Sequence, residues 1–389
     1  MNASDTISFS SSFDFSMSAG NCSPDDTLYL DDPYYASFYL YQPIDKIMTF
    51  YIIPVISVFG ILSNLAFILV VYKVPFMRSP TSCYLVQLAV SDTIFLLVAA
   101  VEKIVLVSST PIQLDMSPIG FVPGCILRPG LLDTPYFASL FFITAVTFDR
   151  YIAICWPLRV RLQTKTRRAK VSLFSWLTAI VFAACLLPAF YTLLCIVPPE
   201  FETSEFPQQI LACDTSFVPK IFYYVRYALQ TLPFFVSLVI DVVLYVAILR
   251  AIRRRKKTMR SALTHSTAQS RHARNAVDRM VLVTGGLFFL LLSPLECYFI
   301  VISISEIFDY YPLSAEQEAI VIWVFRLLSY VNSSINPVVY NITNSRYREA
   351  FKMVFWRKTS KPENSSTSIF NIQHAAQRQA DPSTSVTNA

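Results

Sequence analysis

The sequence predicts an all-α membrane protein built as a bundle of seven transmembrane helices. Hydrophobic residues make up 54% of its 389 residues and charged residues only 15%, which is more apolar surface than a water-soluble globule could cover. Seven apolar stretches are long enough to cross about 30 Å of hydrocarbon as helices. Basic residues gather in every second connection between these stretches, as expected of connections that face the cytoplasm.

The first 45 residues predict an acidic tail outside the cell. They hold seven Asp and no Lys or Arg, and they lack the basic segment and apolar core of a signal peptide. Glycosylation sequons begin at Asn2 and Asn21, and they are usable only if this end of the chain reaches the lumen. The acidic charge of the tail would also attract a basic peptide.

The predicted spans cover residues 47–73, 82–108, 121–155, 171–196, 218–250, 276–306 and 316–341. Because their number is odd and the basic connections are the first, third and fifth, the N-terminus is expected outside and the C-terminus inside. Residues 344–356 place aromatic and aliphatic side chains on one face, which predicts a short helix in the membrane interface. Residues 358–389 are polar and predict a disordered cytoplasmic tail, so residues 46–357 form the membrane domain.

Polar residues inside the spans carry the functional signal, because hydrocarbon makes them costly. The second span contains Leu88–Asp92 (LAVSD), the third ends in Asp149–Tyr151 (DRY), and the seventh contains Asn336–Tyr340 (NPVVY). These motifs resemble the LAxxD, DRY and NPxxY motifs of the rhodopsin-like G-protein-coupled receptors, and each occurs in the expected span. Further residues of the same resemblance are Asn64, Trp176, Pro233 and Pro294.

Buried polar groups in lipid must satisfy one another, so Asp92 is expected to lie in a polar cluster in the middle of the membrane. The other expected members of this cluster are Asn64, Ser139, Asn332, Ser333 and Asn336. An ionised Asp92 would suit a sodium ion there, as the resemblance implies. The alternative is a hydrogen-bonded cluster that packs the helices without an ion.

The resemblance also implies a switch that contacts the G protein at the cytoplasmic ends of the helices. Its residues are Asp149, Arg150, Tyr151, Leu158, Tyr340 and Asp241. A fixed cation such as Arg150 can pair with a neighbour in one state and face a partner in another, although it would serve equally as one more topology charge.

Three positions depart from the family pattern. Leu292 stands where most relatives carry a tryptophan in the sixth span, Asp241 stands where they carry a tyrosine, and Arg274 replaces an acidic residue that often pairs with the DRY arginine. We therefore expect Asp241, or Asp278 one turn beyond Arg274, to pair with Arg150.

The eight cysteines are spread singly with no CxxC, so zinc and redox motifs are not supported and one extracellular disulfide is expected. The resemblance implies that Cys125 forms this bond with a cysteine of the second outer loop. Cys213 is preferred to Cys195, because Cys195 lies close to the end of its predicted span. Cys22 has no assigned partner.

The upper parts of the helices favour a peptide ligand. Leu132 stands where amine receptors carry an aspartate, and Tyr330 stands where opsins carry the retinal-binding lysine, so these two ligand classes are disfavoured. The remaining set offers both signs of charge and several aromatic rings, as a peptide requires. The set is Arg128, Asp133, Gln230, Glu296, Tyr298, Trp323 and Arg326, each of which could instead serve in helix packing or at the rim.

Within the family, the sequence resembles the thyrotropin-releasing-hormone receptor group and its neuromedin-receptor neighbours. The resemblance rests on Met77–Val86, Arg150–Cys155, and Arg326 followed by Tyr330–Pro337. It implies a pocket that contains Arg326 and coupling to Gq-type calcium signalling. Three other residues that the resemblance leads us to expect in that pocket, two tyrosines and an asparagine, are replaced in this sequence. We therefore expect a different short neuropeptide as the ligand, with an amidated one as a candidate. The replacing residues are Asp133, Phe137 and Leu295.

The predicted function is therefore a receptor that binds an extracellular peptide and activates heterotrimeric G proteins, with no enzyme activity and no cofactor beyond the sodium ion. The Ser- and Thr-rich tail predicts arrestin and receptor kinases as partners, beside membrane lipid and no nucleic acid. Alternatives are a receptor for a lipid or small molecule, or a seven-span transporter, channel or membrane hydrolase. The sequence holds no repeats, no glycine-rich broken helices and no histidine within a span to support the latter.

Overall fold

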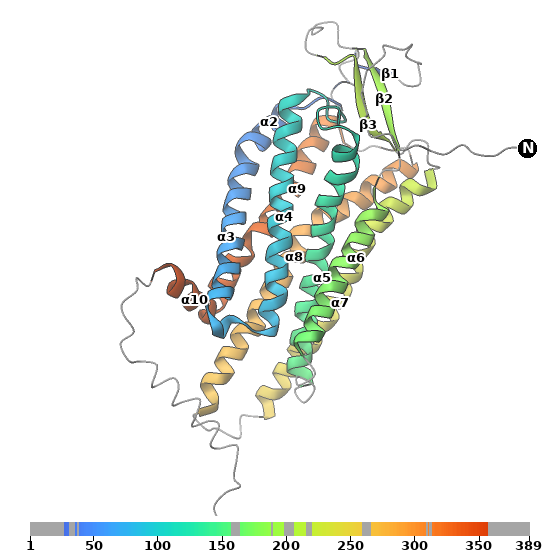
Figure 1. Ribbon diagram of the computed structural model, residues 1–389. Coiled ribbons are helices and arrows are strands. Elements are labelled where there is room, and N and C mark those ends of the chain that lie inside the picture. Colours follow the sequence, from blue (N-terminus) through green and yellow to red (C-terminus); the bar gives the residue numbers. More distant parts are fainter. Residues whose placement is uncertain are drawn as a thin grey trace, which may run out of the picture.

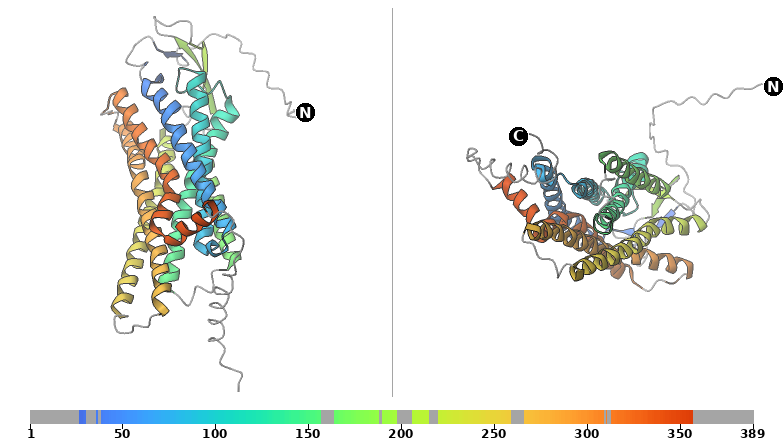
Figure 2. Two further views of the ribbon diagram at one scale, coloured as in Figure 1. Left: turned by 90° about the vertical axis from the view of Figure 1, so that its left-hand side faces the viewer. Right: turned by 90° about the horizontal axis from the view of Figure 1, so that it is seen from below.

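The computed structural model describes residues 27–30, 36, 39–156, 164–187, 190–197, 206–214, 220–258, 266–308, 310 and 313–356. In this part of the chain, long helices run side by side as one bundle (Figures 1 and 2). A small β-sheet lies at one end of the bundle, and a short helix, α10 (Ser345–Phe355), lies near the other end, across the direction of the long helices (Figure 1). We call these two ends the sheet end and the α10 end.

The bundle contains the seven predicted helical segments. In chain order they are α2, η2 and α3 (Pro43–Ile47, Met48–Ile52, Ile53–Lys73), α4 (Pro80–Ser109), η4 and α5 (Val122–Leu127, Arg128–Cys155), α6 (Lys165–Cys185), α7 (Lys220–Thr258), α8 (Ser266–Phe308) and α9 (Ala315–Thr343). Six of these segments are long and apolar enough to cross a membrane. The seventh is α4, which has 30 residues and packs against α3, α5 and α9. The predicted fold class is therefore confirmed.

Side-chain caps define where several of these helices begin. Ser79 precedes α4 and its hydroxyl accepts a hydrogen bond from the Ser82 backbone amide at 3.1 Å, with Pro80 at the first helical position. Ser314 and Gln317 form a reciprocal capping box at the start of α9. These local signals place the ends of helices that the apolar pattern alone leaves uncertain by a few residues.

The centre of the bundle is packed by large apolar side chains. Fully buried examples are Phe67, Leu85, Leu88, Phe137, Phe142, Phe234 and Phe288. At Gly60, an added Cβ would lie 2.4 Å from the Ser334 Oγ atom, so the missing side chain lets α3 and α9 approach closely. Other large apolar side chains, such as Val55, Phe59 and Leu62, point outward, as expected of helices that face lipid.

The sheet has the strand order β1-β2-β3, with β1 (Thr27–Tyr29) parallel and β3 (Gln209–Asp214) antiparallel to β2 (Phe190–Val197). The prediction of a span that continues to residue 196 is therefore wrong, because α6 ends at Cys185. Pro188 in the sequence disfavours continuation of the helix, and the aromatic and β-branched residues that follow it favour a strand.

The sheet joins segments that are far apart in the sequence. Thr27 is paired with Cys195, and Leu40 forms an isolated bridge with Ile112. A small apolar cluster lies beneath these pairings and contains Leu30, Ala36, Ile112, Ile196 and Ile210. Part of the predicted N-terminal tail thus packs against the end of the bundle.

The short helix predicted after the last span is present as α10. The Asn344 side chain caps it by accepting a hydrogen bond from the Arg346 backbone amide at 3.0 Å. Tyr347 is buried against the bundle, and its hydroxyl lies 3.1 Å from the Ser82 hydroxyl. Burial raises the pKa of the Tyr347 phenol, so this group stays neutral and keeps its hydrogen bond.

Candidate functional site

A buried polar core lies between α3, α4, α5 and α9, around Asp92. The Asn336 amide donates a hydrogen bond to Asp92 Oδ2 at 2.8 Å, and the Ser139 hydroxyl donates one to Asp92 Oδ1 at 3.2 Å. The Asn64 amide donates to the Ser333 carbonyl at 2.9 Å. All five residues are buried, so the structure brings the predicted polar cluster together.

A cavity of about 20 Å³ lies beside this core, with Ser139, Asn332 and Ser333 in a wall that also includes apolar side chains. This volume suits one water molecule or one ion of similar size. The nearby oxygen donors, a carboxylate and hydroxyls, are the ligands that small hard cations prefer. The residues present therefore fit a sodium ion as well as an ordered water.

At the α10 end, Arg150 is held between α4 and α5. Its guanidinium lies 3.1 Å from Asp149 Oδ2 and donates a hydrogen bond to the Thr81 hydroxyl, which itself donates to Asp149 Oδ2 at 2.9 Å. Thr81 is a residue that the sequence reasoning missed. The side chain of Arg150 is only 15% exposed, so this arrangement removes most of its charge from solvent.

This pairing differs from the prediction that Asp241 or Asp278 pairs with Arg150. Asp241 accepts a hydrogen bond from the Thr144 hydroxyl at 2.6 Å instead, and the ion pair that Arg150 forms within the described residues is with Asp149. The physical reason is the position of Asp241 along the bundle axis. Asp241 lies beside Thr144, and Thr144 is six residues, or about 9 Å, from Arg150 along α5.

Of the remaining predicted switch residues, Tyr340 and Tyr151 lie in the described part of the chain and Leu158 does not. Tyr340 is buried, and its ring centroid lies 5.0 Å from that of Phe67 and 5.9 Å from that of Tyr347. Tyr151 is partly buried beside Phe148, with a centroid distance of 6.4 Å. Leu158 lies outside the residues that the structure describes, as do Asn2 and Asn21.

Between α7 and α8, a close contact depends on a glycine. The Tyr245 hydroxyl lies 3.2 Å from the Thr147 hydroxyl and occupies the space beside Gly285, where an added Cβ would lie 1.6 Å from the Tyr245 oxygen. No side chain other than hydrogen fits there without movement of Tyr245 or α8.

One turn from the absent tryptophan, a polar pair joins α5 to α8. Glu296 is fully buried and accepts a hydrogen bond from the Tyr136 hydroxyl at 2.5 Å. Its second carboxyl oxygen has no hydrogen-bond partner among the described residues. A buried carboxyl group held by one phenol is a strong polar link between two otherwise apolar helix faces.

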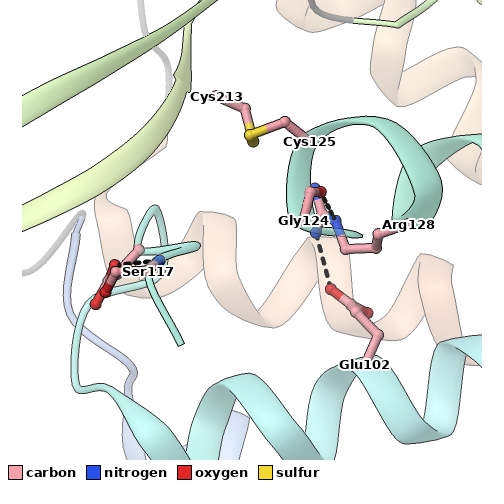
Figure 3. Close-up of a disulfide and its surroundings, with 7 residues drawn as sticks. Glu102, Ser117, Gly124, Cys125, Arg128 and Cys213 are labelled. Carbon is pink, nitrogen blue, oxygen red and sulfur yellow. Dashed lines mark hydrogen bonds and ion pairs between the residues drawn. A yellow bond between two sulfur atoms is a disulfide. The ribbon is translucent and has the colours of Figure 1, made fainter. Parts of the chain in front are cut away.

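The disulfide between Cys125 and Cys213 is present and ties the start of the third span to β3, with a Cα–Cα distance of 5.4 Å (Figure 3). The prediction for this bond is therefore confirmed. Cys195 is also disulfide-bonded, which corrects the expectation of one bridge. Cys195 lies in β2, next to the N-terminal segment through its pairing with Thr27, and not at the end of a span. Cys22 lies outside the described residues.

Beside this disulfide, at the sheet end, a polar cavity of about 280 Å³ opens between the helices. Its wall includes Arg128, Trp323 and Arg326, three residues predicted to contact the ligand. The wall also includes residues that the sequence reasoning missed, namely Tyr41, Asp45, Lys103, Gln113 and Arg226. Residues from the N-terminal segment and from α4, α5, α7 and α9 thus meet at one place.

Hydrogen bonds and ion pairs fix much of this wall. Arg128 Nη1 lies 2.9 Å from Glu102 Oε1 and its Nε donates to the Gly124 carbonyl at 3.1 Å (Figure 3). The Trp323 indole donates to Asp45 Oδ1 at 2.5 Å. The Arg326 guanidinium lies 5.8 Å from the centroid of the Trp323 ring, which is within cation–π range.

Four other predicted ligand residues do not line this cavity. Glu296 lies in the pair with Tyr136, and the Tyr298 hydroxyl donates to Glu318 at 2.7 Å near the start of α9. Gln230 on α7 and Asp133 on α5 are partly buried. The charges of Arg226 and Arg128 act on Asp133, although no ion pair within 4 Å forms among the described residues.

Some of the missed residues had a signal in the sequence and others had none. Lys103 and Glu102 are adjacent charges inside a predicted span, and such charges in a membrane usually mark a functional site. Tyr41 and Asp45 had no such signal, because they fall in the predicted tail and only the folded N-terminal segment places them in the wall.

Comparisons with known proteins agree with this arrangement. Residues 63–340 match the family described as 7 transmembrane receptor (rhodopsin family). The thyrotropin-releasing hormone receptor of Gallus gallus is 30% identical over 354 residues, which cover 84% of each chain. The same receptor of Homo sapiens is 29% identical over 350 residues, with 83% of this chain and 82% of the relative covered.

Neuromedin-U receptor 2 of Homo sapiens is 28% identical over 306 residues, which cover 77% of this chain and 69% of the relative. The similar proteins are thus receptors and not enzymes. Together with the seven-helix bundle, the disulfide and the buried polar core, the family match over residues 63–340 shows that the chain belongs to the rhodopsin family of seven-transmembrane receptors.

Proposed function

We propose that the protein is a G-protein-coupled receptor that binds a peptide in the cavity at its sheet end and activates heterotrimeric G proteins at its α10 end. The observation that supports this most is the course of α5. This one helix carries Arg128 in the cavity wall, Ser139 in the polar core, and Asp149 and Arg150 at the opposite end. A ligand that shifts α5 can therefore act on the Arg150 pairing.

The sheet end is proposed to face the outside of the cell and the α10 end the cytoplasm. The Lys/Arg-free N-terminal residues, the sequons at Asn2 and Asn21, and the two disulfide-bonded segments of the sheet end favour this orientation, since disulfides persist in oxidising surroundings. A peptide ligand is favoured by the names of the relatives, which are receptors for a releasing hormone and for a neuromedin. Gq-type calcium signalling is proposed from the same resemblance.

Sodium is proposed as an allosteric ion beside Asp92. The carboxylate of Asp92 and the hydroxyls of Ser139 and Ser333 would hold it, in or next to the cavity of about 20 Å³. Because the ion would join α4, α5 and α9, it would favour the conformation in which these helices are packed as described. Arrestin and receptor kinases are proposed partners of the C-terminal tail, and membrane lipid surrounds the bundle.

The test expresses the full chain in cells and applies a library of short peptides, with calcium and cAMP as readouts. At least one peptide is expected to give a concentration-dependent signal that is lost in Arg150→Ala at equal surface expression. Arg348→Ala, a change of the same charge on an exposed part of α10, serves as the matched control. A response to lipids or other small molecules only, or a peptide response that does not need Arg150, would contradict the proposal.

A further inference from the structure

The wall of the sheet-end cavity carries an excess of positive charge, which indicates the chemical class of the ligand group that enters it. The inference drawn from this charge rests on the proposed function. We propose that the cavity binds a carboxylate group of the peptide, either the side chain of an Asp or Glu residue or a free C-terminus. The cavity wall contains four basic residues, Lys103, Arg128, Arg226 and Arg326, and one acidic residue, Asp45. A neutral, amidated ligand would leave this excess of positive charge without a partner.

The acidic residues near the cavity are already engaged. Asp45 accepts the Trp323 indole at 2.5 Å and the Gln42 backbone amide at 2.6 Å. Glu102 lies behind the wall and pairs with Arg128 at 2.9 Å and with Lys103 at 3.6 Å. The side chain of Glu102 is 6% exposed, so this carboxylate faces its two ion-pair partners and not the solvent.

Arg226 and Arg326 are the two basic residues that remain. Neither has a carboxylate within 4 Å among the residues that the structure describes, and Arg326 has the ring of Trp323 as its neighbour. Asp133 feels the charge of Arg226, but it lies outside the cavity wall and beyond ion-pair distance. Among the described residues, the four basic residues of the wall outnumber these three acids, Asp45, Glu102 and Asp133, even when all three are ionised.

A carboxylate matches the excess of positive charge in the cavity wall better than a neutral group does. Partly buried guanidinium groups are costly without an acceptor, and their planar donors match the two oxygens of a carboxylate. The Tyr41 phenol is a further donor in the wall, because burial and the nearby acids raise its pKa and keep it protonated. A cavity of about 280 Å³ is larger than one carboxylate and leaves room for part of the peptide that carries it.

The inference changes the expected ligand. The acidic N-terminal residues would attract a basic peptide, and an amidated peptide is a candidate from the sequence. The positive charge of the cavity wall instead favours a negatively charged hydrogen-bond acceptor as the group that enters the cavity. Any basic part of the ligand is therefore expected outside the cavity, near the N-terminal residues.

The test measures the thermal stability of the purified full-length protein with three small probes at equal millimolar concentration. Acetyl-Ala-Glu-amide carries a side-chain carboxylate, acetyl-Ala-Ala carries a terminal carboxylate, and acetyl-Ala-Gln-amide is neutral. A ligand that binds only the folded state raises the Tm, and at least one carboxylate probe is expected to raise it by about 2 °C or more above the neutral probe. The probe that acts identifies the source of the carboxylate.

Variants locate the effect. Arg326→Gln and Arg226→Gln are expected to remove the difference between the carboxylate and neutral probes, whereas Arg326→Lys keeps part of it. Lys352→Gln on α10 changes the charge by the same amount far from the cavity and is the matched control. The inference would be overturned by equal Tm shifts with neutral and carboxylate probes, or by a carboxylate-specific Tm shift that persists in both arginine variants. Two arginine positions are tested so that the result does not depend on the folding of one variant.

A parallel assay in cells separates this inference from the proposed function. Pools of short peptides with acidic residues or free C-termini are compared with neutral amidated pools for G-protein activation. If carboxylate probes bind through Arg326 but no pool activates a G protein, the charge of the cavity is as inferred and the receptor function fails. If a neutral amidated pool activates and carboxylate probes do not bind, the receptor function stands and this inference fails.

Discussion

A single missing side chain decides how closely α7 and α8 approach at Tyr245. The Tyr245 hydroxyl fills the space beside Gly285, and it also lies within hydrogen-bond distance of Thr147 on α5. Three helices therefore meet at one phenol in a setting where interior packing leaves little room for adjustment. Such a position responds strongly to the addition of one methyl group.

Gly285→Ala is expected to destabilise the protein by about 1–3 kcal/mol, because the new methyl group would displace Tyr245 or α8. Thermal unfolding of the purified variant measures the effect. Gly286→Ala is the matched control, since nothing lies within 4 Å of an added Cβ there and alanine favours a helix over glycine. Equal Tm values for the two variants would show that Tyr245 is not packed as described.

Tyr136→Phe is expected to cost about 1–3 kcal/mol, because it leaves the fully buried Glu296 without its hydrogen bond. Tyr298→Phe also removes one hydroxyl that bonds to a carboxylate, but Glu318 at that site is only partly buried, so a smaller loss is expected. Chemical or thermal unfolding of both variants gives the comparison. A larger loss for Tyr298→Phe would argue against a hydrogen-bonded Glu296.

At the scale of elements, α4 and α5 are joined at the α10 end by Thr81. Its hydroxyl contacts both Arg150 and Asp149, so it holds the arginine against α4 in the described conformation. The sequence suggested a partner on α7 or α8 for this arginine. The contact found instead involves α4 and α5, two helices that also pack against each other through other residues.

Thr81→Val is expected to raise ligand-independent G-protein activation several-fold, because it removes the hydroxyl that restrains Arg150. Thr93→Val is the matched control, since the Thr93 hydroxyl donates to the Ala89 carbonyl of its own helix at 2.7 Å and makes no other hydrogen bond among the described residues. Basal calcium or inositol phosphate signals are compared at equal surface expression. The same basal signal from both variants would contradict a restraining role for Thr81.

Elements also show what the sequence could and could not predict. The polar core followed from Asp92, Asn336 and Ser139, because polar residues in a span have few partners other than one another. The sheet could not be found in this way, since the pairing of Thr27 with Cys195 joins residues far apart in the sequence. For the same reason the sequence predicts Asp45 and Tyr41 in a tail, although they line the cavity together with residues of α4, α5, α7 and α9.

At the scale of the whole molecule, the polar core lies along α5 between the sheet-end cavity and Arg150. Asp92 lies between the cavity and Arg150, and its hydrogen bonds reach α5 and α9. An ion at Asp92 would therefore stabilise one arrangement of the entire bundle and not one helix alone.

Sodium chloride is expected to raise the Tm of the wild-type protein more than choline chloride at the same ionic strength. Asp92→Asn should lose this difference, because it removes the charge that holds the ion, and Asp115→Asn at the sheet end is a control for loss of a buried carboxylate elsewhere. Scans from low to high salt at fixed pH supply the measurement. A sodium effect that persists in Asp92→Asn would rule out this site.

The contact between Trp323 and Asp45 has an optical consequence. The chain has four tryptophans, and Trp323 is the one in the wall of the sheet-end cavity. The fluorescence emission wavelength of an indole depends on the charges beside it. The Trp323 indole is hydrogen-bonded to the Asp45 carboxylate and lies near the Arg326 guanidinium. A carboxylate that enters the cavity would change both neighbours, so the protein carries its own fluorescent reporter of ligand entry.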